Sequence, residues 1–418
     1  MFMTNIFHRK YYLLTLMLQG VGMLGLPYIF KSAGWIGGFF VTLVFSSVAW
    51  RTSILLGREL NGDPRPTWMF DDKVLEAASQ NPRMKKQLSS FPDIARAAFG
   101  KVGNIVLSFC LYFELFSCLC IFFVTLGDHL HTLFPSVPMK THMAHVSFVV
   151  AIPTALLRTP RLLSYLSAVG TCATACVVLS VLGSAIYSGD ISEEVADEKG
   201  IEVEATHVLW RGRGLPLAFG LIAYTFSGHA IIPSIYTSMA RPQQFESMIT
   251  FTFTAVTFCC LVVAVSGYYM FGSTVDDQIT LSLEEHSGDG NIMMTTLTWL
   301  MILTAFSKFT LTAFPLALGL EEIFAPLIPS DEVMEWVSSF IKLILIGSSL
   351  SVAIFVPSFS LLCSLVGLIC TMIVSVIFPA AAHLKLFGMQ LPFWEKAIDW
   401  IFIISGVFMS ILGTIQSI

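Results

Sequence analysis

Long apolar stretches constrain this chain more than any other feature of its sequence. A helix needs about 20 mainly apolar residues to cross the hydrocarbon core of a bilayer, and eleven stretches approach or exceed that length. Hydrophobic residues make up 55% of the chain and charged residues 12%. We therefore predict an all-α polytopic membrane protein with eleven transmembrane helices. The predicted spans are Tyr12–Phe30, Gly34–Leu56, Asn104–Leu126, Met143–Leu157, Leu163–Tyr187, Leu215–Ser238, Ser247–Phe271, Ile292–Leu318, Trp336–Val356, Phe359–Phe378 and Ala397–Leu412.

The Lys and Arg residues outside these spans indicate how the chain is oriented. If the N-terminus lies in the cytoplasm, the cytoplasmic segments hold roughly three times as many Lys and Arg residues as the opposite side. The positive-inside rule then predicts a cytoplasmic N-terminus.

The segments between the spans form no separate soluble module, so residues 1–418 are interpreted as one transmembrane domain. The largest cytoplasmic segment is the loop 57–103. Within it, residues 90–100 place apolar side chains on one helical face behind a Ser90 cap, which predicts a short amphipathic helix. The loops 188–212 and 272–291, on the lumenal or extracellular side, are acidic, and we interpret them as solvated.

Two predicted spans carry residues that interrupt a helix. Gly22–Pro27 and Gly228–Pro233 both follow the pattern G-x-x-x-x-P, and they begin two successive blocks of five spans. Unwound backbone in a membrane is tolerated where it lines a cavity or meets a ligand, and matching breaks in two halves are typical of inverted-repeat transporters. We therefore predict a five-plus-five inverted repeat with broken helices 1 and 6, plus one extra helix. The alternative is a pair of proline kinks at helix packing contacts.

Four segments of the chain resemble one family of membrane proteins. They are the Gly-rich first span GVGMLGLPYIFKSAGWIGG, the third span FPDIARAAFGKVGNIVLSFCLYFEL with LGDHLHTLFP after it, the sixth span SGHAIIPSIYTSMARPQQF, and the eighth span SKFTLTAFPLALGLEE. Together they are similar to the amino acid and auxin permease family. The resemblance is to its vacuolar amino acid transporter branch in particular, which includes the vesicular transporter for inhibitory amino acids. The chain departs from the family pattern at His129, where the family has Asn, and at Ser307, where it has Thr.

The resemblance implies the same eleven spans and the movement of amino acids, commonly coupled to protons and sometimes to sodium. It also favours a vacuolar, lysosomal or vesicular membrane, with the plasma membrane as the alternative. Antiport and symport use the same fold, so the direction of coupling stays open.

The two helix breaks hold the predicted substrate site. We expect the backbone of Gly20, Gly22 and Gly25 in the first span, and of Ser227, Gly228 and His229 in the sixth, to bind the carboxylate and ammonium of an amino acid. The glycines have a second interpretation as packing residues, and His229 has one as a hydrogen-bond partner between helices.

Two charged residues lie deep within predicted spans. Lys308 is near the middle of the eighth span and Glu114 is in the third, and such charges are costly in a bilayer unless they face a cavity or a partner. We predict that both act in ion coupling, as a neutralising pair or as two stations of a proton path. The alternatives are a structural ion pair and, for Lys308, a side chain that reaches the interface. Little further buried charge is expected, which favours substrates with neutral side chains.

The predicted function is secondary active transport of amino acids, coupled to protons by alternating access. A sodium-coupled symporter and a non-transporting amino acid sensor are the alternatives. Motifs for a nucleophile with its base, a metal cluster or a phosphate-binding loop are not found, so we predict no enzyme activity, cofactor, metal site or nucleic-acid partner. The expected partners are the amino acid, protons and the lipid bilayer.

Overall fold

The computed structural model describes residues 21–65, 88, 90–156, 160–188, 206–239, 241–287, 292–324 and 331–417. All regular secondary structure in these ranges is helical, as the apolar stretches predict. The α-helices are α2 (Leu26–Asn61), α4 (Phe91–Leu133), α5 (Met139–Leu156), α6 (Pro160–Ser188), α7 (Leu215–Thr225), α8 (Ile232–Ser238), α9 (Phe245–Phe271), α10 (Ile279–Ser287), α11 (Ile292–Phe324), α12 (Asp331–Phe355), α13 (Phe359–Val366), α14 (Phe378–Phe387) and α15 (Phe393–Ser417).

Short helices of other types connect these elements. The 3₁₀-helices are η1 (Val21–Gly25), η3 (Gly212–Gly214), η4 (His229–Ile231), η5 (Pro242–Gln244) and η6 (Gly272–Thr274). A π-helical segment, η8 (Gly367–Ile377), lies between α13 and α14, so the predicted tenth span is a composite of three segments.

Eight helical segments of the described chain are long and apolar enough to cross a membrane. The chain is therefore an integral membrane protein. Helix α2 accounts for the end of the first predicted span and all of the second. It bends at Gly34, whose φ of 79° lies in the left-handed region and whose Cβ position would be 2.8 Å from the Leu209 carbonyl, so only glycine fits.

The N-terminal part of α4 occupies the segment predicted as an amphipathic helix. Ser90 is its N-cap and accepts a hydrogen bond from the Asp93 amide, and Gly100, with φ 71°, turns the chain into the third span. Phe91 packs on Phe378 of α14, with ring centroids 5.2 Å apart. The short helix is thereby docked against the tenth span.

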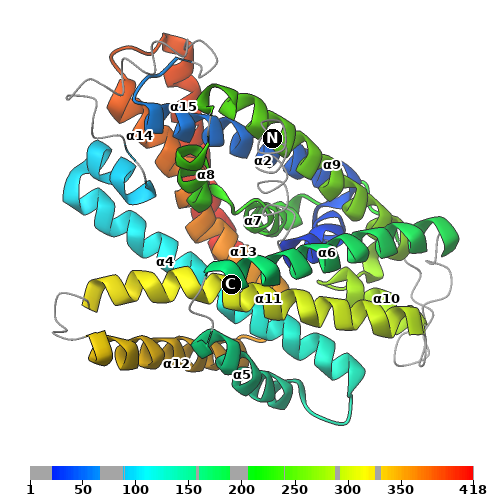
Figure 1. The fold of residues 1–418 in the computed structure, drawn as a ribbon. Helices are drawn as coiled ribbons and strands as arrows, with labels where there is room; N and C mark the ends of the chain where they lie inside the picture. Colours follow the sequence, from blue (N-terminus) through cyan, green and yellow to red (C-terminus); the bar gives the residue numbers. More distant parts are fainter. Residues whose placement is uncertain are drawn as a thin grey trace.

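Helix α7 lies in the middle of the bundle and is buried along its second half (Figure 1). It approaches η8 backbone to backbone, since a Cβ on Gly367 would lie 1.9 Å from the Gly220 carbonyl oxygen. Around this centre, α2 packs on α9, and α11 packs on both α4 and α6. The contact of α4 with α11 includes an edge-to-face pair, Phe123 and Phe309, with centroids 4.9 Å apart.

Helix α15 shows how the outer surface is adapted to lipid. One of its faces exposes large apolar side chains at helical spacing, which in water would form an unfavourable patch but in a bilayer meets hydrocarbon. The side chains include Trp400, Ile404, Phe408, Ile411 and Ile415.

Candidate transport site

The second predicted helix break is present, and it touches η1, the 3₁₀ segment that leads into α2 where the first break was predicted. Helix α7 ends at Thr225, and the chain passes through Phe226–Gly228 before it resumes a helical path in η4 and α8. The Thr225 hydroxyl donates to the Gly22 carbonyl at 3.2 Å and to the Leu221 carbonyl at 2.9 Å, and both bonds are buried. Segments about 200 residues apart are thus joined at the centre of the molecule.

Gly22 permits this close approach. A Cβ at this position would lie 2.9 Å from the Thr225 hydroxyl oxygen, 3.0 Å from the Thr225 Cα and 3.1 Å from the Tyr224 ring. Because one of these atoms belongs to the backbone, a side chain at residue 22 would push the two interrupted helices apart.

A pocket lies against the first of these breaks. It is lined by residues from η1, α6, α9, α10 and α11, and its cavity volume of about 20 Å³ has room for about one water molecule, so it is nearly closed in this conformation. The lining residues are Met23, Leu24, Thr174, Val177, Val178, Val181, Val263, Ile279, Met301, Thr304 and Lys308.

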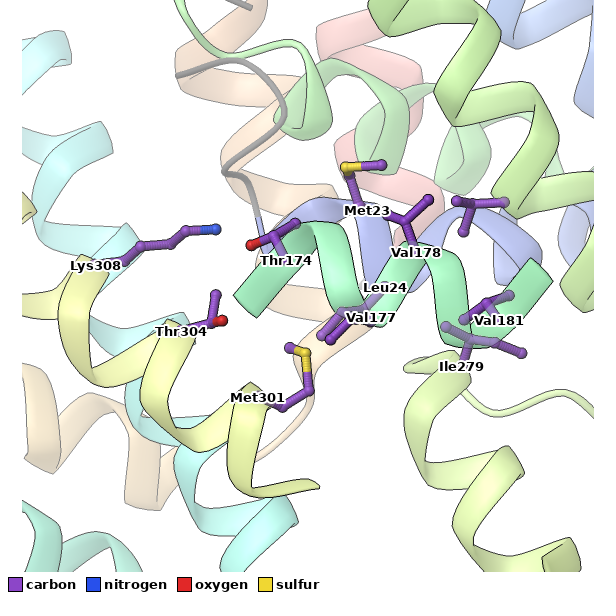
Figure 2. A pocket seen from close by; sticks show the side chains of 11 residues that line it. Met23, Leu24, Thr174, Val177, Val178, Val181, Ile279, Met301, Thr304 and Lys308 are labelled. Carbon is purple, nitrogen blue, oxygen red and sulfur yellow. The ribbon is translucent and has the colours of Figure 1, made fainter. Parts of the chain in front are cut away.

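Helical periodicity explains why two of the walls look as they do. Met301, Thr304 and Lys308 recur at spacings of three and four residues, so they line one face of α11. The same spacing places Thr174 and the valines on one face of α6, across the pocket from α11. Figure 2 shows Lys308 extending from α11 toward Thr174, with the valines farther along α6.

Two of the three polar side chains that line this pocket are unsatisfied within the described residues, while the Thr174 hydroxyl donates to the Gly170 carbonyl. The Lys308 ammonium and the Thr304 hydroxyl are buried, and neither has a hydrogen-bond partner within the described part of the chain. A buried cation without a partner is strongly unfavourable, and so is a buried hydroxyl to a lesser degree. The arrangement can therefore bind an anionic group at Lys308 and Thr304, while the valines and methionines contact an apolar group.

The residues predicted to bind substrate lie in different environments. Gly20 is outside the described residues. Gly22 and Gly25 are buried in η1, where they flank the pocket residues Met23 and Leu24. Ser227 and Gly228 lie in the second break and are not among the residues that line the pocket.

His229 is directed into the helix bundle. Its Nε2 lies 3.0 Å from the Thr52 hydroxyl, 3.1 Å from the Ser53 hydroxyl and 3.2 Å from the Ala49 carbonyl, all on α2. These contacts correspond to the structural interpretation of this residue, a hydrogen-bond partner between helices.

Glu114 is buried, but it lies apart from Lys308. Its Oε1 accepts a 2.7 Å hydrogen bond from the Thr371 hydroxyl of η8. Within the described residues no ion pair joins Glu114 to Lys308, so the two do not neutralise each other directly.

The acidic loop 272–291 contributes to the site, which the sequence reasoning missed. Its helix α10 places Ile279 in the pocket wall. The Gln278 amide donates to Asp128 at 2.6 Å, the Thr280 hydroxyl lies 2.8 Å from His129 Nε2, and the Ser360 amide donates to Asp277 at 3.1 Å. Ile279 and Leu283, four residues apart within the acidic loop, are the signal that indicates a packed helical face.

Comparison with known proteins agrees with this architecture. The family model "Transmembrane amino acid transporter protein" matches residues 9–66 and 73–418. The chain belongs to this family.

Relatives from Arabidopsis thaliana match nearly the whole chain. It is 32% identical to amino acid transporter AVT1C over 96% of this chain and 67% of the relative, and 30% identical to amino acid transporter AVT1B over 96% and 68%. Both are named as transporters, and the family shows that this chain is a transporter rather than an enzyme.

A solved structure shows the fold as well. MhsT, crystallised in complex with L-phenylalanine, superposes with a TM-score of 0.57 over 97% of this chain and 98% of that one, at 14% sequence identity. At this identity the likeness concerns the fold alone.

Proposed function

We propose that the chain is a secondary active transporter that moves amino acids by alternating access and draws on a proton gradient. One observation carries the proposal: the Lys308 ammonium is buried, and no described residue pairs with it, at an apolar pocket beside η1. An amino acid with an apolar side chain supplies an anion for Lys308 and an apolar group that matches the apolar lining of the pocket.

The proposed substrate position follows from the lining. The carboxylate meets Lys308 and Thr304, and the side chain packs on the valines of α6 and on Met301. The backbone at Gly22 and Gly25, together with Ser227 and Gly228, offers helix ends to the charged groups of the zwitterion, and Gly20, outside the described residues, stays a predicted contact. In this proposal His229 positions the second break through its contacts with α2.

Proton coupling follows from the cost of burying the Lys308 charge. A charged amine without a counterion is disfavoured in this environment, so either loss of its proton or arrival of a carboxylate relieves the cost. Proton binding and substrate binding then reinforce each other, since coupling between two ligands is reciprocal. This linkage favours symport, in which the proton and the substrate move in the same direction. Antiport would require the proton to leave as the substrate binds.

We assign coupling to Lys308 rather than to a pair of Lys308 with Glu114. Glu114 is bonded to Thr371 and lies apart from the pocket, so its carboxyl is proposed to hold α4 against the π-helical segment η8. We also propose a vacuolar, lysosomal or vesicular membrane with a cytoplasmic N-terminus, on the resemblance to the vacuolar branch and the loop charges.

Uptake of radiolabelled amino acids into proteoliposomes tests this function. The pH gradient is imposed with either sign, with and without sodium. We expect accumulation of neutral amino acids that follows the pH gradient and ignores sodium. Lys308→Met should abolish uptake. Lys308→Arg, which keeps the charge but does not release a proton, should bind substrate without accumulating it.

Lys385→Met is the matched control, because Lys385 is exposed on α14. It should transport normally. Accumulation driven by sodium alone would replace proton coupling with sodium coupling. Binding of amino acids without any transport by the unsubstituted protein would indicate a sensor.

A further inference from the structure

A second group of ionisable residues lies away from the pocket, where the end of α2 meets α14 and α15 (Figure 1). Its members come from four helices that are distant in the sequence, and most of them are buried. They are Arg51, Arg58 and Glu59 of α2, Glu246 of α9, His383 of α14, and Glu395 and Asp399 of α15.

The outer members balance their own charges. The Arg58 guanidinium lies 3.1 Å from Glu246 and 4.0 Å from Glu395, and Arg51 lies 3.9 Å from Glu395. Two cations therefore face two carboxylates. This part of the group needs no further ion.

The inner members are completely buried. His383 Nδ1 and Asp399 Oδ2 are 2.7 Å apart, and both side chains have an exposed fraction of 0%. Glu59 has the same exposed fraction. Both oxygens of Glu59, the second oxygen of Asp399 and Nε2 of His383 have no hydrogen-bond partner within the described residues.

Within the described part of the chain, no cation is placed to balance Glu59 directly. Asp399 is the charged group whose field acts on it most directly, and it has the same sign. Other elements packed on α2 carry titratable groups elsewhere: Tyr236 of α8 lies near Glu246, while Tyr224 of α7 and Cys370 of η8 lie near Glu114. The charge of Arg51 also acts on Asp399, but Arg51 is already opposed by Glu395, so Glu59 is left without a cation of its own among the described residues.

Protons are the species that can balance them. Two ionised carboxylates with one neutral imidazole would leave two negative charges in a dry environment, a state that costs several kcal/mol per ion. His383 Nδ1 and Asp399 Oδ2 are in contact at 2.7 Å, and a proton on Glu59 removes the charge beside this pair. A metal ion is not indicated, because no group of three or more His, Cys, Asp or Glu side chains in the described chain has the geometry to hold one.

We propose that Glu59, His383 and Asp399 form a proton-binding site that fastens the end of α2 to α14 and α15. The site is separate from the pocket, and the inference does not depend on which solute the pocket binds. When the site loses a proton, unpaired negative charge accumulates between these three helices and loosens their contact.

The sign of the pH dependence follows from proton counting. At neutral pH the folded site holds a proton on Glu59, whereas a glutamate in the unfolded chain, with an ordinary pKa of about 4.3, has released it. The folded state therefore binds more protons, and the free energy of unfolding falls as the pH rises.

Thermal unfolding of the purified full-length chain in detergent tests this inference. We expect the melting temperature to decline from about pH 6 to about pH 9, and Glu59→Gln, which mimics the protonated side chain, to remove most of that decline. Asp399→Asn should flatten the same profile, and it replaces Glu59→Gln as the test variant if Glu59→Gln does not fold. Glu285→Gln, at an exposed glutamate of α10, is the matched control and should keep the unsubstituted profile.

Infrared spectroscopy at neutral pH gives a second measurement. The difference spectrum of the unsubstituted protein minus Glu59→Gln should show the C=O stretch of a protonated carboxyl group. Unchanged melting profiles in both variants, or a difference spectrum that shows only an ionised carboxylate, would overturn the inference.

Discussion

The Thr225 hydroxyl and the Gly22 carbonyl, 3.2 Å apart, join the two interrupted helices of this transporter. The bond lies at the end of α7 and within η1, next to the residues that line the pocket. A change in the distance between the two breaks therefore alters the pocket wall directly. This relationship makes residue 22 the most sensitive position for a small substitution.

Gly22→Ala is expected to abolish or strongly reduce transport. The added methyl group would meet the Thr225 hydroxyl at 2.9 Å and the Thr225 Cα at 3.0 Å. The Cα is a backbone atom, so it cannot move aside as the end of a flexible side chain could. Overpacking of this kind typically costs about 1–3 kcal/mol. Uptake into proteoliposomes and the melting temperature measure the two effects.

Gly183→Ala is the control for this prediction. Residue 183 lies in α6, a Cβ there meets nothing within 4 Å, and alanine is favoured over glycine in a helix by about 1 kcal/mol. This variant should transport normally and be at least as stable. Normal uptake by Gly22→Ala would show that the close contact of the breaks is not required.

Lys308→Met is expected to raise the melting temperature while it abolishes transport. Methionine has a similar length and removes a buried charge that has no partner in the described residues, and replacing buried charges with apolar groups stabilises proteins by about 1–4 kcal/mol. Function and stability then oppose each other at one residue, as is common in binding sites. A lower melting temperature would show that the ammonium is satisfied in the resting protein.

The helical architecture could be predicted because its signals are local. Apolar stretches mark the spans, and the two G-x-x-x-x-P patterns mark the breaks, which depend on residues only five positions apart. The predicted ends were less accurate. Helix α2 continues to Asn61 and α15 begins at Phe393, beyond the apolar stretches, because neighbouring helices cover their polar ends.

This inaccuracy explains one part of a wrong expectation, the burial of Glu59, whereas Asp399 lies inside the predicted span Ala397–Leu412 and was overlooked. The sequence predicted little buried charge beyond Glu114 and Lys308, yet Glu59 and Asp399 have an exposed fraction of 0%. Glu59 lies past the predicted second span, and its burial depends on contacts of α2 with α14 and α15 that the sequence pattern does not specify. The sequence could not predict that Glu114 and Lys308 form no ion pair in the described chain, because tertiary packing decides which side chains meet.

The contact between Glu114 and Thr371 is expected to contribute to stability rather than to substrate binding. Thr371→Val would remove the donor that Glu114 accepts at 2.7 Å and leave a buried carboxyl unsatisfied, at a cost of about 1–3 kcal/mol. A double-mutant cycle with Glu114→Leu, which removes the acceptor, measured by thermal unfolding, should give a coupling energy in that range. Additive effects would show that the two side chains act independently.

Asp277→Asn is expected to stabilise the protein at neutral pH. Asp277 lies between η6 and α10, and burial raises the pKa of its carboxyl above the ordinary value, although the Ser360 amide partly offsets this. An acid with a raised pKa in the folded state binds more protons than in the unfolded chain, so its contribution to stability is greatest at low pH and is lost as the pH rises through that pKa. Asparagine still accepts the Ser360 bond and carries no charge. The melting temperature of the variant should therefore exceed that of the unsubstituted protein at pH 7, and the difference should shrink toward about pH 4.

Asp63→Asn provides a control of opposite sign for the effect at Asp277. Hydrogen bonding from Arg65 lowers the pKa of Asp63, so its ionised form contributes stability above the ordinary pKa and loses it as the pH falls. This variant should melt slightly lower at pH 7, by a small amount because the pair is largely exposed. If both variants shifted the melting temperature in the same direction, loss of a carboxylate in general, rather than burial of Asp277 beside the pocket wall, would account for the effect. Opposite shifts would show that the α10 segment is held in place at the cost of burying an acid.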